Sequence, residues 1–247
     1  MKRVLVTRPE PGASRTAARL EADGFTPIML PLTEILPLEP ALPDGDIAAV
    51  AISSANAIRG APAPLVASLS SKPVFAVGDE TAAAARAAGF ADVRSSAGDA
   101  AGLVRDVTAG MPAKARTAYL CGRVRLDTLE AQLAALGFSV VAIETYDTHE
   151  RLPALEELNA LDAGGPVASA LVYSAKGAAC LARVVSPRTG TIFRDTAFIC
   201  ISPRVARELA TVASGSVLAA KTPDENAMFE LLGRPGHDPA PFSTNLA

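Results

Sequence analysis

Two kinds of segment each occur twice along this chain, and this internal repeat constrains the fold more than any other feature of the sequence. The first kind is an apolar strand, an Ala-rich stretch, a Gly-Phe pair and a second strand. Its copies are "VLVTRP…GFTPIMLPLTEI" (4–35) and, with one gap near the start, "AYLCGR…GFSVVAIETYDT" (118–148). The second kind is "AAVAISSANA…FAVGDETAAAA" (48–85) and "SALVYSAKGA…ICISPRVAREL" (169–209). We call the two copies of the first kind A and A′ and the two copies of the second kind B and B′. Their order along the chain, A, B, A′, B′, indicates an internal duplication.

Short β-rich runs alternate with helical stretches throughout the chain, a pattern typical of parallel α/β sheets. A length of 247 residues suits two compact units, each with its own core. We therefore predict the α/β class, with two flavodoxin-like doubly wound parallel-sheet domains joined by a two-stranded linker. The predicted strands are 3–7, 26–30, 47–52, 73–77, 115–121, 139–144, 167–173, 196–201 and 216–220, with a weaker one near 92–94.

The linkers decide which segments share a domain. Long connections follow A and A′, whereas only "AGMPAKA" (109–115) separates B from A′. This favours an interleaved arrangement, in which domain two is inserted into domain one, over tandem A–B and A′–B′ domains. The predicted boundaries are 1–35 with 150–247 for domain one and 38–145 for domain two, with crossing linkers near 31–38 and 144–150. The linker strands "LTEI" and "ETYDT" would pair antiparallel and place Tyr146 at the mouth of an interdomain cleft.

Composition excludes several function classes. Aromatic residues make up only 4% and the net charge is -3, so we expect no nucleic-acid partner. No apolar run approaches a membrane span, and no G-x-G-x-x-G or P-loop motif is present. Two histidines give no workable metal site. The cysteines, predicted to be buried reduced thiols, are Cys121, Cys180 and Cys200.

Four strand ends pass directly into helices, in "ISSANA", "AVGDETA", "VYSAKGA" and "ICISPRVA". Hydroxyl residues there are ordinary helix caps, yet four helix N-termini at sheet edges would also offer backbone N–H groups to an anion. We therefore expect an anionic ligand held more by backbone than by side chains. The candidate ligand-binding residues at these ends are Ser53, Ser54, Asn56, Gly78, Thr81, Ser174, Lys176, Gly177 and Ser202.

Four more residues complete the candidate site. Arg8, preceded by Thr7, and Arg123 stand at equivalent loops of A and A′, although a lone loop arginine is usually a solvated charge. Tyr146 is one of three tyrosines in the chain. It either packs its ring at a linker with the hydroxyl in water, or presents the phenol as a general acid.

The motifs "VLVTRP", "ISSANAI", "AVGDETA", "GFSVVAIETY" and "LVYSAKGA", in this order and spacing, resemble the uroporphyrinogen-III synthase family over residues 3–232. The resemblance implies a cofactor-free cytoplasmic lyase that closes hydroxymethylbilane into uroporphyrinogen III, with inversion of the last pyrrole ring and loss of water. It also implies two α/β domains joined by a two-stranded ribbon with the active site between them. The substrate, handed over by hydroxymethylbilane synthase, carries eight carboxylates, and we expect a monomer.

By the same resemblance, Tyr146 matches a tyrosine that assists departure of the substrate hydroxyl, while Thr81, Ser54 and Ser174 match family motif residues. The chain departs from the family in "ICISPRVA", where Ser202 replaces a glycine and Val205 a threonine, and in "ISSANAI", which lacks an aromatic residue and a threonine. Two alternatives stay open. One is a two-lobed binding or regulatory protein for a carboxylate-rich ligand, and the other is a transferase or flavodoxin-like enzyme with a cofactor or phosphate.

Overall fold

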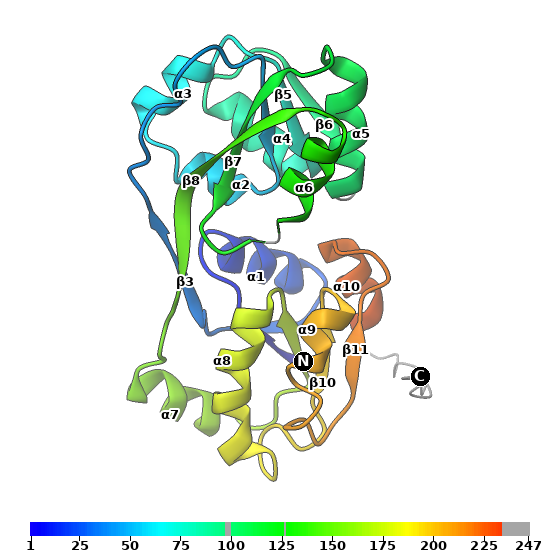
Figure 1. Cartoon of the computed structure of the whole chain (residues 1–247). Helices are drawn as coiled ribbons and strands as arrows, with labels where there is room; N and C mark the ends of the chain where they lie inside the picture. Colours follow the sequence, from blue (N-terminus) through cyan, green and yellow to red (C-terminus); the bar gives the residue numbers. More distant parts are fainter. Residues whose placement is uncertain (97–99, 126, 234–247) are drawn as a thin grey trace. The chain divides into compact units, whose positions relative to one another are not determined.

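A computed structural model describes residues 1–96, 100–125 and 127–233 of the chain. The chain divides into two compact units (Figure 1). Unit 1 consists of Met1–Glu34 together with the chain from Glu150 onward, and unit 2 is Ile35–His149. Each unit contains one main sheet with its own core.

The unit 1 sheet has the strand order β11-β10-β9-β1-β2, and all its described pairings are parallel. This confirms the predicted α/β class with parallel sheets. Its strands are β1 (Arg3–Val6), β2 (Thr26–Met29), β9 (Ser169–Val172), β10 (Ala197–Cys200) and β11 (Val217–Ala219).

The second sheet has the order β3-β8-β7-β4-β5-β6, and the strands from β8 to β6 pair in parallel. Its strands are β3 (Thr33–Pro37), β4 (Ala49–Ile52), β5 (Val74–Val77), β6 (Val93–Ser96), β7 (Arg116–Gly122) and β8 (Ser139–Glu150). All ten predicted strands are present. Strand β8 runs beyond its predicted end at 144, because its polar second half pairs with β3.

The repeat is visible in the strand order. When A is matched with A′, strands β1 and β2 are equivalent to β7 and β8. When B and B′ are matched and extended to the next strand of each, β4, β5 and β6 are equivalent to β9, β10 and β11. Apart from β3, which forms one edge of the second sheet, both sheets then have the third, second and first of these B-type strands followed by the first and second A-type strands. The two units therefore share one strand order. They differ in the order along the chain, because unit 1 begins with its A-type strands and unit 2 with its B-type strands.

Helices cover both faces of each sheet (Figure 1). In unit 1, Val4 and Val6 pack toward α1 and α10, whereas Leu5 packs toward α7, α8 and α9, as expected for side chains that alternate along a strand. The helices of unit 1 are α1 (Gly12–Ala22), α7 (Leu155–Ala163), α8 (Ala175–Val185), α9 (Pro203–Arg207) and α10 (Glu225–Leu232).

Unit 2 has the same two-faced core. Val50 and Ile52 pack with the helices α2, α3 and α4, and Ala49 and Ala51 pack with α5 and α6. The helices are α2 (Ala55–Arg59), α3 (Ala63–Leu69), α4 (Gly78–Ala87), α5 (Ala100–Gly110) and α6 (Thr128–Ala135). The three cysteines are buried and free, as predicted.

Strands β3 and β8 lie side by side in the sheet order. The Leu38 N–H donates to the Thr145 carbonyl at 2.9 Å, and the Arg151 N–H donates to the Leu32 carbonyl at 3.0 Å. Residue numbers rise along one strand while they fall along the other, so the pairing is antiparallel. Tyr146 therefore lies within this ribbon, on β8 in unit 2.

Candidate active site

Tyr146 lies in the second half of β8, opposite the end of β7. Cys121 pairs with Glu144 and the next residue, Gly122, pairs with Tyr146, so the register shifts at this point. The Arg123 N–H donates to the Tyr146 carbonyl at 2.8 Å. The irregularity thus turns the tyrosine side chain out of the regular alternation.

The Tyr146 side chain is half-buried and packs against the core that α2, α3 and α4 share with the sheet. Burial raises the pKa of the Tyr146 phenol above its ordinary value, while the nearby Ser54 side chain acts in the opposite direction. The phenol is therefore protonated at neutral pH and can donate a hydrogen bond.

Helix α2 begins beside this hydroxyl. Ser54 is its N-cap, and its Oγ accepts from the Asn56 N–H at 3.2 Å. Asn56 Oδ1 accepts from Arg59 at 3.4 Å. Ser53 is exposed, and its Oγ lies 2.7 Å from the Tyr119 hydroxyl. The "ISSANA" residues and Tyr146 are therefore brought together in one unit.

The start of α4 is the second predicted site in unit 2. Gly78 has φ +74° with open space where a Cβ would be, and Thr81 is buried in the first turn. Asp79 and Glu80 also lie in that turn, and their charges oppose an anion at this N-terminus. Support for anion binding here is consequently weaker than the sequence suggested.

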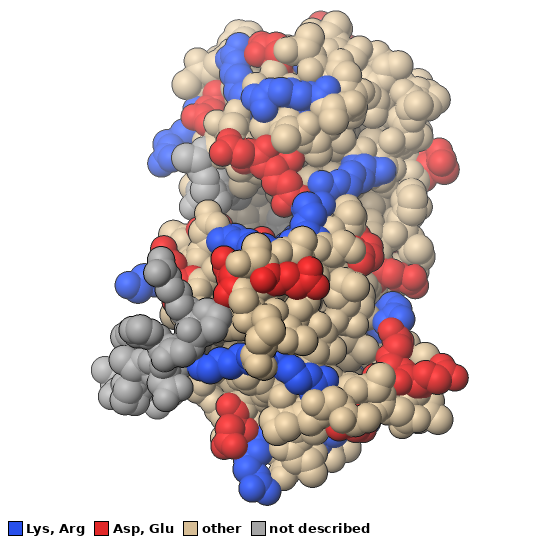
Figure 2. Space-filling view, turned by 180° about the vertical axis from the view of Figure 1, so that it is seen from behind, with Lys and Arg blue, Asp and Glu red and all other residues tan. Residues whose placement is uncertain are grey.

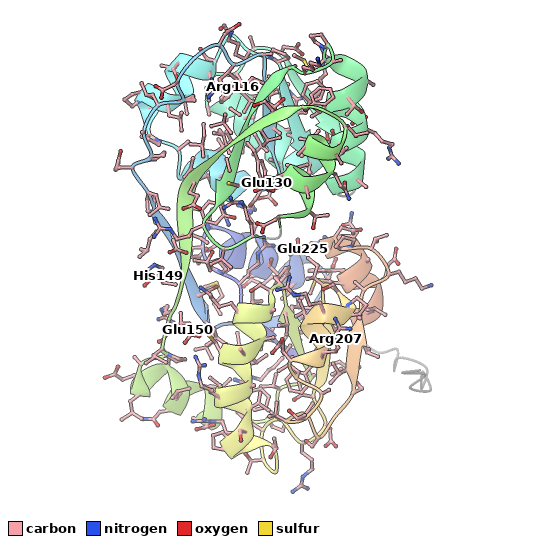
Figure 3. All side chains as sticks on the ribbon, viewed as in Figure 1. Arg116, Glu130, His149, Glu150, Arg207 and Glu225 are labelled. Atoms are coloured by element: carbon pink, nitrogen blue, oxygen red, sulfur yellow. The ribbon has the colours of Figure 1, made fainter. Side chains whose placement is uncertain are left out.

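Arg123 is held between two carboxylates. Its Nε lies 3.2 Å from Glu144 and its Nη1 lies 3.5 Å from Asp147. Arg125 bonds Glu144 at 3.1 Å and Glu130, on α6, at 2.6 Å (Figure 3). Hydrogen bonds from Arg125 and then Arg123 lower the pKa of Glu144. A substrate carboxylate would have to compete with these acids for Arg123.

In unit 1, Arg8 is fixed by its neighbours. Its Nη1 lies 3.2 Å from Glu225 Oε1, and its guanidinium lies 4.4 Å from the centre of the Tyr173 ring. Glu225, at the start of α10 (Figure 3), also accepts from Thr16 and Tyr173 at 2.6 Å each. Thr7 is buried and donates to the Leu171 carbonyl at 2.8 Å, so its hydroxyl is engaged inside the unit.

Burial alone would raise the pKa of Glu225. The hydrogen bonds from Thr16 and Tyr173, together with the charges of Arg8 and Arg19, outweigh burial and lower it. Burial also raises the pKa of Tyr173 well above its usual range. The cluster therefore keeps an ionised carboxylate next to Arg8.

Two helix N-termini of unit 1 carry predicted residues. Ser174 caps α8 by accepting from the Gly177 N–H at 3.0 Å, and Ser202 caps α9 by accepting from the Val205 N–H at 3.5 Å. The ordinary capping role thus explains both hydroxyls. Neither helix has an acid in its first turn, where Lys176 lies in α8 and Arg204 in α9, so both N-termini suit an anion.

Of the candidate residues, the two described cavities include Arg123 alone. A cavity of about 500 Å³ in unit 2 contains Arg123 but not Tyr146, with Arg116 (Figure 3) also in its wall. A cavity of about 760 Å³ in unit 1 contains none of the predicted residues. In the part of the chain that the structure describes, no His, Cys, Asp or Glu cluster could hold a metal.

The face shown in Figure 2 has basic side chains interspersed with acidic ones, so it carries no broad area of a single sign. No helix in the described part of the chain combines the length and apolar character that a membrane crossing requires.

Sequence reasoning missed three groups around the predicted residues. Gly60 and Gly122 lie against Tyr146, Glu225 holds Arg8, and Tyr119 bonds Ser53. The repeat gives a signal only for Gly122. If Arg8 is matched with Arg123 and Thr7 with Cys121, Gly122 has no counterpart.

The family model of uroporphyrinogen-III synthase HemD matches residues 14–230. The chain belongs to the uroporphyrinogen-III synthase family. This family consists of cyclising lyases of tetrapyrrole biosynthesis, so the family resemblance and the enzyme class predicted from the sequence are confirmed.

Two solved structures of uroporphyrinogen-III synthases resemble the chain. The enzyme from Helicobacter pylori 26695 has a TM-score of 0.63 at 17% identity, covering 94% of this chain and 98% of its own. A mutant enzyme from the extremely thermophilic bacterium Thermus thermophilus has a TM-score of 0.50 at 19% identity, covering 94% and 97%. At these identities the likeness supports the fold alone. A comparison with curated proteins finds no significant match.

Proposed function

We propose that this chain cyclises hydroxymethylbilane to uroporphyrinogen III with Tyr146 as the general acid. The observation that carries the residue assignment is the phenol itself. The phenol lies near Ser54 at the start of α2, and burial keeps it protonated. A neutral phenol beside a helix start can donate to a departing oxygen while backbone N–H groups restrain the anionic substrate.

The reaction balances with this one acid. The C–O bond of the hydroxymethyl group breaks, its oxygen takes the Tyr146 proton and leaves as water, and the pyrrole nitrogen electron pair forms an azafulvene. The substituted carbon of the last ring attacks to give a spiro intermediate, which fragments and recloses with that ring inverted. The proton released on rearomatisation returns to the phenolate. Holding the substrate conformation is the larger task, because free bilane closes without inversion.

The proposed substrate contacts come from both units. Unit 2 offers Arg123 and the residues at the starts of α2 and α4, and unit 1 offers Arg8 and the starts of α8 and α9. Backbone N–H groups are proposed to dominate, since the Ser174 and Ser202 hydroxyls act as caps. The full proposed set is Thr7, Arg8, Ser53, Ser54, Asn56, Gly78, Thr81, Arg123, Ser174, Lys176, Gly177 and Ser202.

We also propose that the two units are flavodoxin-like domains, 1–35 with 150–247 and the inserted 38–145, joined by linkers near 31–38 and 144–150. The parallel sheets with helices on both faces support this description. As a cytoplasmic monomer, the enzyme would work without a cofactor and receive its substrate from hydroxymethylbilane synthase.

Replacing Tyr146→Phe tests the catalytic assignment. Phenylalanine keeps the ring and removes only the hydroxyl, so we expect kcat to fall about 10²-fold, the usual effect of a lost general acid, with KM little changed. Steady-state rates with fresh hydroxymethylbilane, corrected for the uncatalysed reaction, provide the measurement. Because the pKa of Tyr146 is raised above 10.0, its deprotonation should not lower wild-type kcat below that pH. A Phe variant with wild-type kcat would assign Tyr146 to packing.

A further inference from the structure

The Tyr146 side chain occupies a slot between two glycines of unit 2. A Cβ added at Gly122 would lie 2.6 Å from Tyr146 Cζ and 2.9 Å from its hydroxyl oxygen. A Cβ added at Gly60 would lie 2.6 Å from the Thr145 carbonyl oxygen and 3.1 Å from Tyr146 Cβ. The two glycines therefore contact opposite ends of the tyrosine, and Gly122 faces the end that carries the reactive group.

The contact at Gly122 is set by the backbone. Gly122 is the residue at which the β7–β8 register shifts, and the hydrogen bond from the Arg123 N–H to the Tyr146 carbonyl fixes the two strands just beyond it. Gly122 itself is buried. A side chain there could not turn away, so the tyrosine ring would have to recede by about 1 Å to regain an ordinary separation of about 3.5–4.0 Å.

Ser54 lies near enough to the phenol to act on its pKa, and its own Oγ is fixed because it accepts the capping bond from the Asn56 N–H. The close approach of Gly122 therefore limits where the phenol oxygen lies beside the start of α2.

The repeat connects the glycine with the tyrosine independently of the coordinates. Copy A runs from Thr7 directly to Arg8 and has Thr33 at the position of Tyr146. Copy A′ has both the additional Gly122 and the tyrosine. The extra residue occurs in the copy that carries the phenol.

We propose that Gly122 is a positioning residue for Tyr146. Its missing side chain leaves the space in which the phenol hydroxyl lies, so that the hydroxyl meets the departing oxygen. The inference rests on the proposed function of Tyr146 as the acid. Its competitor is a purely structural role, in which Gly122 only permits a half-buried ring to pack.

A double-mutant cycle separates these roles. We expect Gly122→Ala to lower kcat by roughly 10-fold to 10²-fold, since a misplacement of about 1 Å can have that effect, with KM within about twofold of wild type. In the Tyr146→Phe background, the same substitution should change kcat by less than about twofold, because no hydroxyl is left to misplace. Gly190→Ala is the matched control, since its Cβ would meet nothing within 4 Å, and its kcat should stay at the wild-type value.

A second cycle, Ser54→Ala with Tyr146→Phe, changes a residue beside the phenol without crowding the slot, and tests whether the surroundings of the hydroxyl limit kcat if Gly122→Ala does not fold. An unchanged kcat in Gly122→Ala, or equal losses with and without the Tyr146 hydroxyl in either cycle, would overturn the inference. If Tyr146→Phe alone keeps wild-type kcat, the assignment of Tyr146 as the acid is wrong. If Tyr146→Phe lowers kcat but the losses of kcat in the cycle are additive, only the positioning role of Gly122 is wrong.

Discussion

At the scale of single residues, the sequence identified Tyr146 but not the residues that surround it. The tyrosine stood out because only one copy of a repeated phrase carries it. Gly60 and Gly122 meet it across 86 and 24 residues of chain, and no local pattern encodes such a contact. Glu225 was missed for the same reason, because it reaches Arg8 from the far end of the chain.

Glu225 allows a pH-dependent prediction at this scale. The pKa of Glu225 is lowered from 4.5 in the folded protein, so its contribution to stability is complete above 4.5 and is lost below it, as the pH falls through the lowered pKa of the folded state. Glu225→Gln should lower the free energy of unfolding by about 2 kcal/mol at pH 7, as expected for lost hydrogen bonds to a charged group. Urea unfolding followed by circular dichroism should show this difference narrowing below about pH 4.5. A difference that stays constant from neutral pH down to about pH 3.5 would contradict the assigned charge.

At the scale of elements, the strands and the strand-to-helix passages were predictable from period and composition. The caps were predictable too, since Ser54, Ser174 and Ser202 each accept a backbone hydrogen bond at a helix start. What the sequence could not distinguish is a cap from a ligand contact, because both need a hydroxyl at the same place. The acids at the start of α4 show that helix starts of one chain differ in their suitability for anions.

Two substitutions at Ser174 separate capping from anion binding at α8. Aspartate is a good N-cap, so Ser174→Asp should retain wild-type stability while its charge repels substrate carboxylates and raises KM roughly threefold to tenfold. Ser174→Ala should lower the free energy of unfolding by about 1 kcal/mol with a smaller effect on KM. Thermal unfolding measures the stability of both variants, and steady-state kinetics measure their KM. An unchanged KM in Ser174→Asp would remove the α8 N-terminus from the substrate site.

At the scale of the whole molecule, the duplication made the two-sheet architecture predictable, because equivalent segments must build equivalent sheets. The strand orders of the two sheets agree with this prediction, because repeat-equivalent strands occupy equivalent positions in both sheets. Residues 35–149 are continuous in sequence and hold two apolar clusters of their own. We therefore expect a fragment of these residues to fold alone, with cooperative urea unfolding and dispersed amide NMR signals. A fragment without cooperative unfolding would show that unit 2 depends on unit 1.

The product formed from hydroxymethylbilane tests the central claim most directly. The wild-type protein is incubated with freshly prepared bilane, and the oxidised uroporphyrin isomers are separated and compared with those of an enzyme-free sample. The account predicts catalytic turnover with the type III isomer as the main product, whereas the enzyme-free sample gives type I. Type I alone in both samples, or binding of the bilane without turnover, would contradict it.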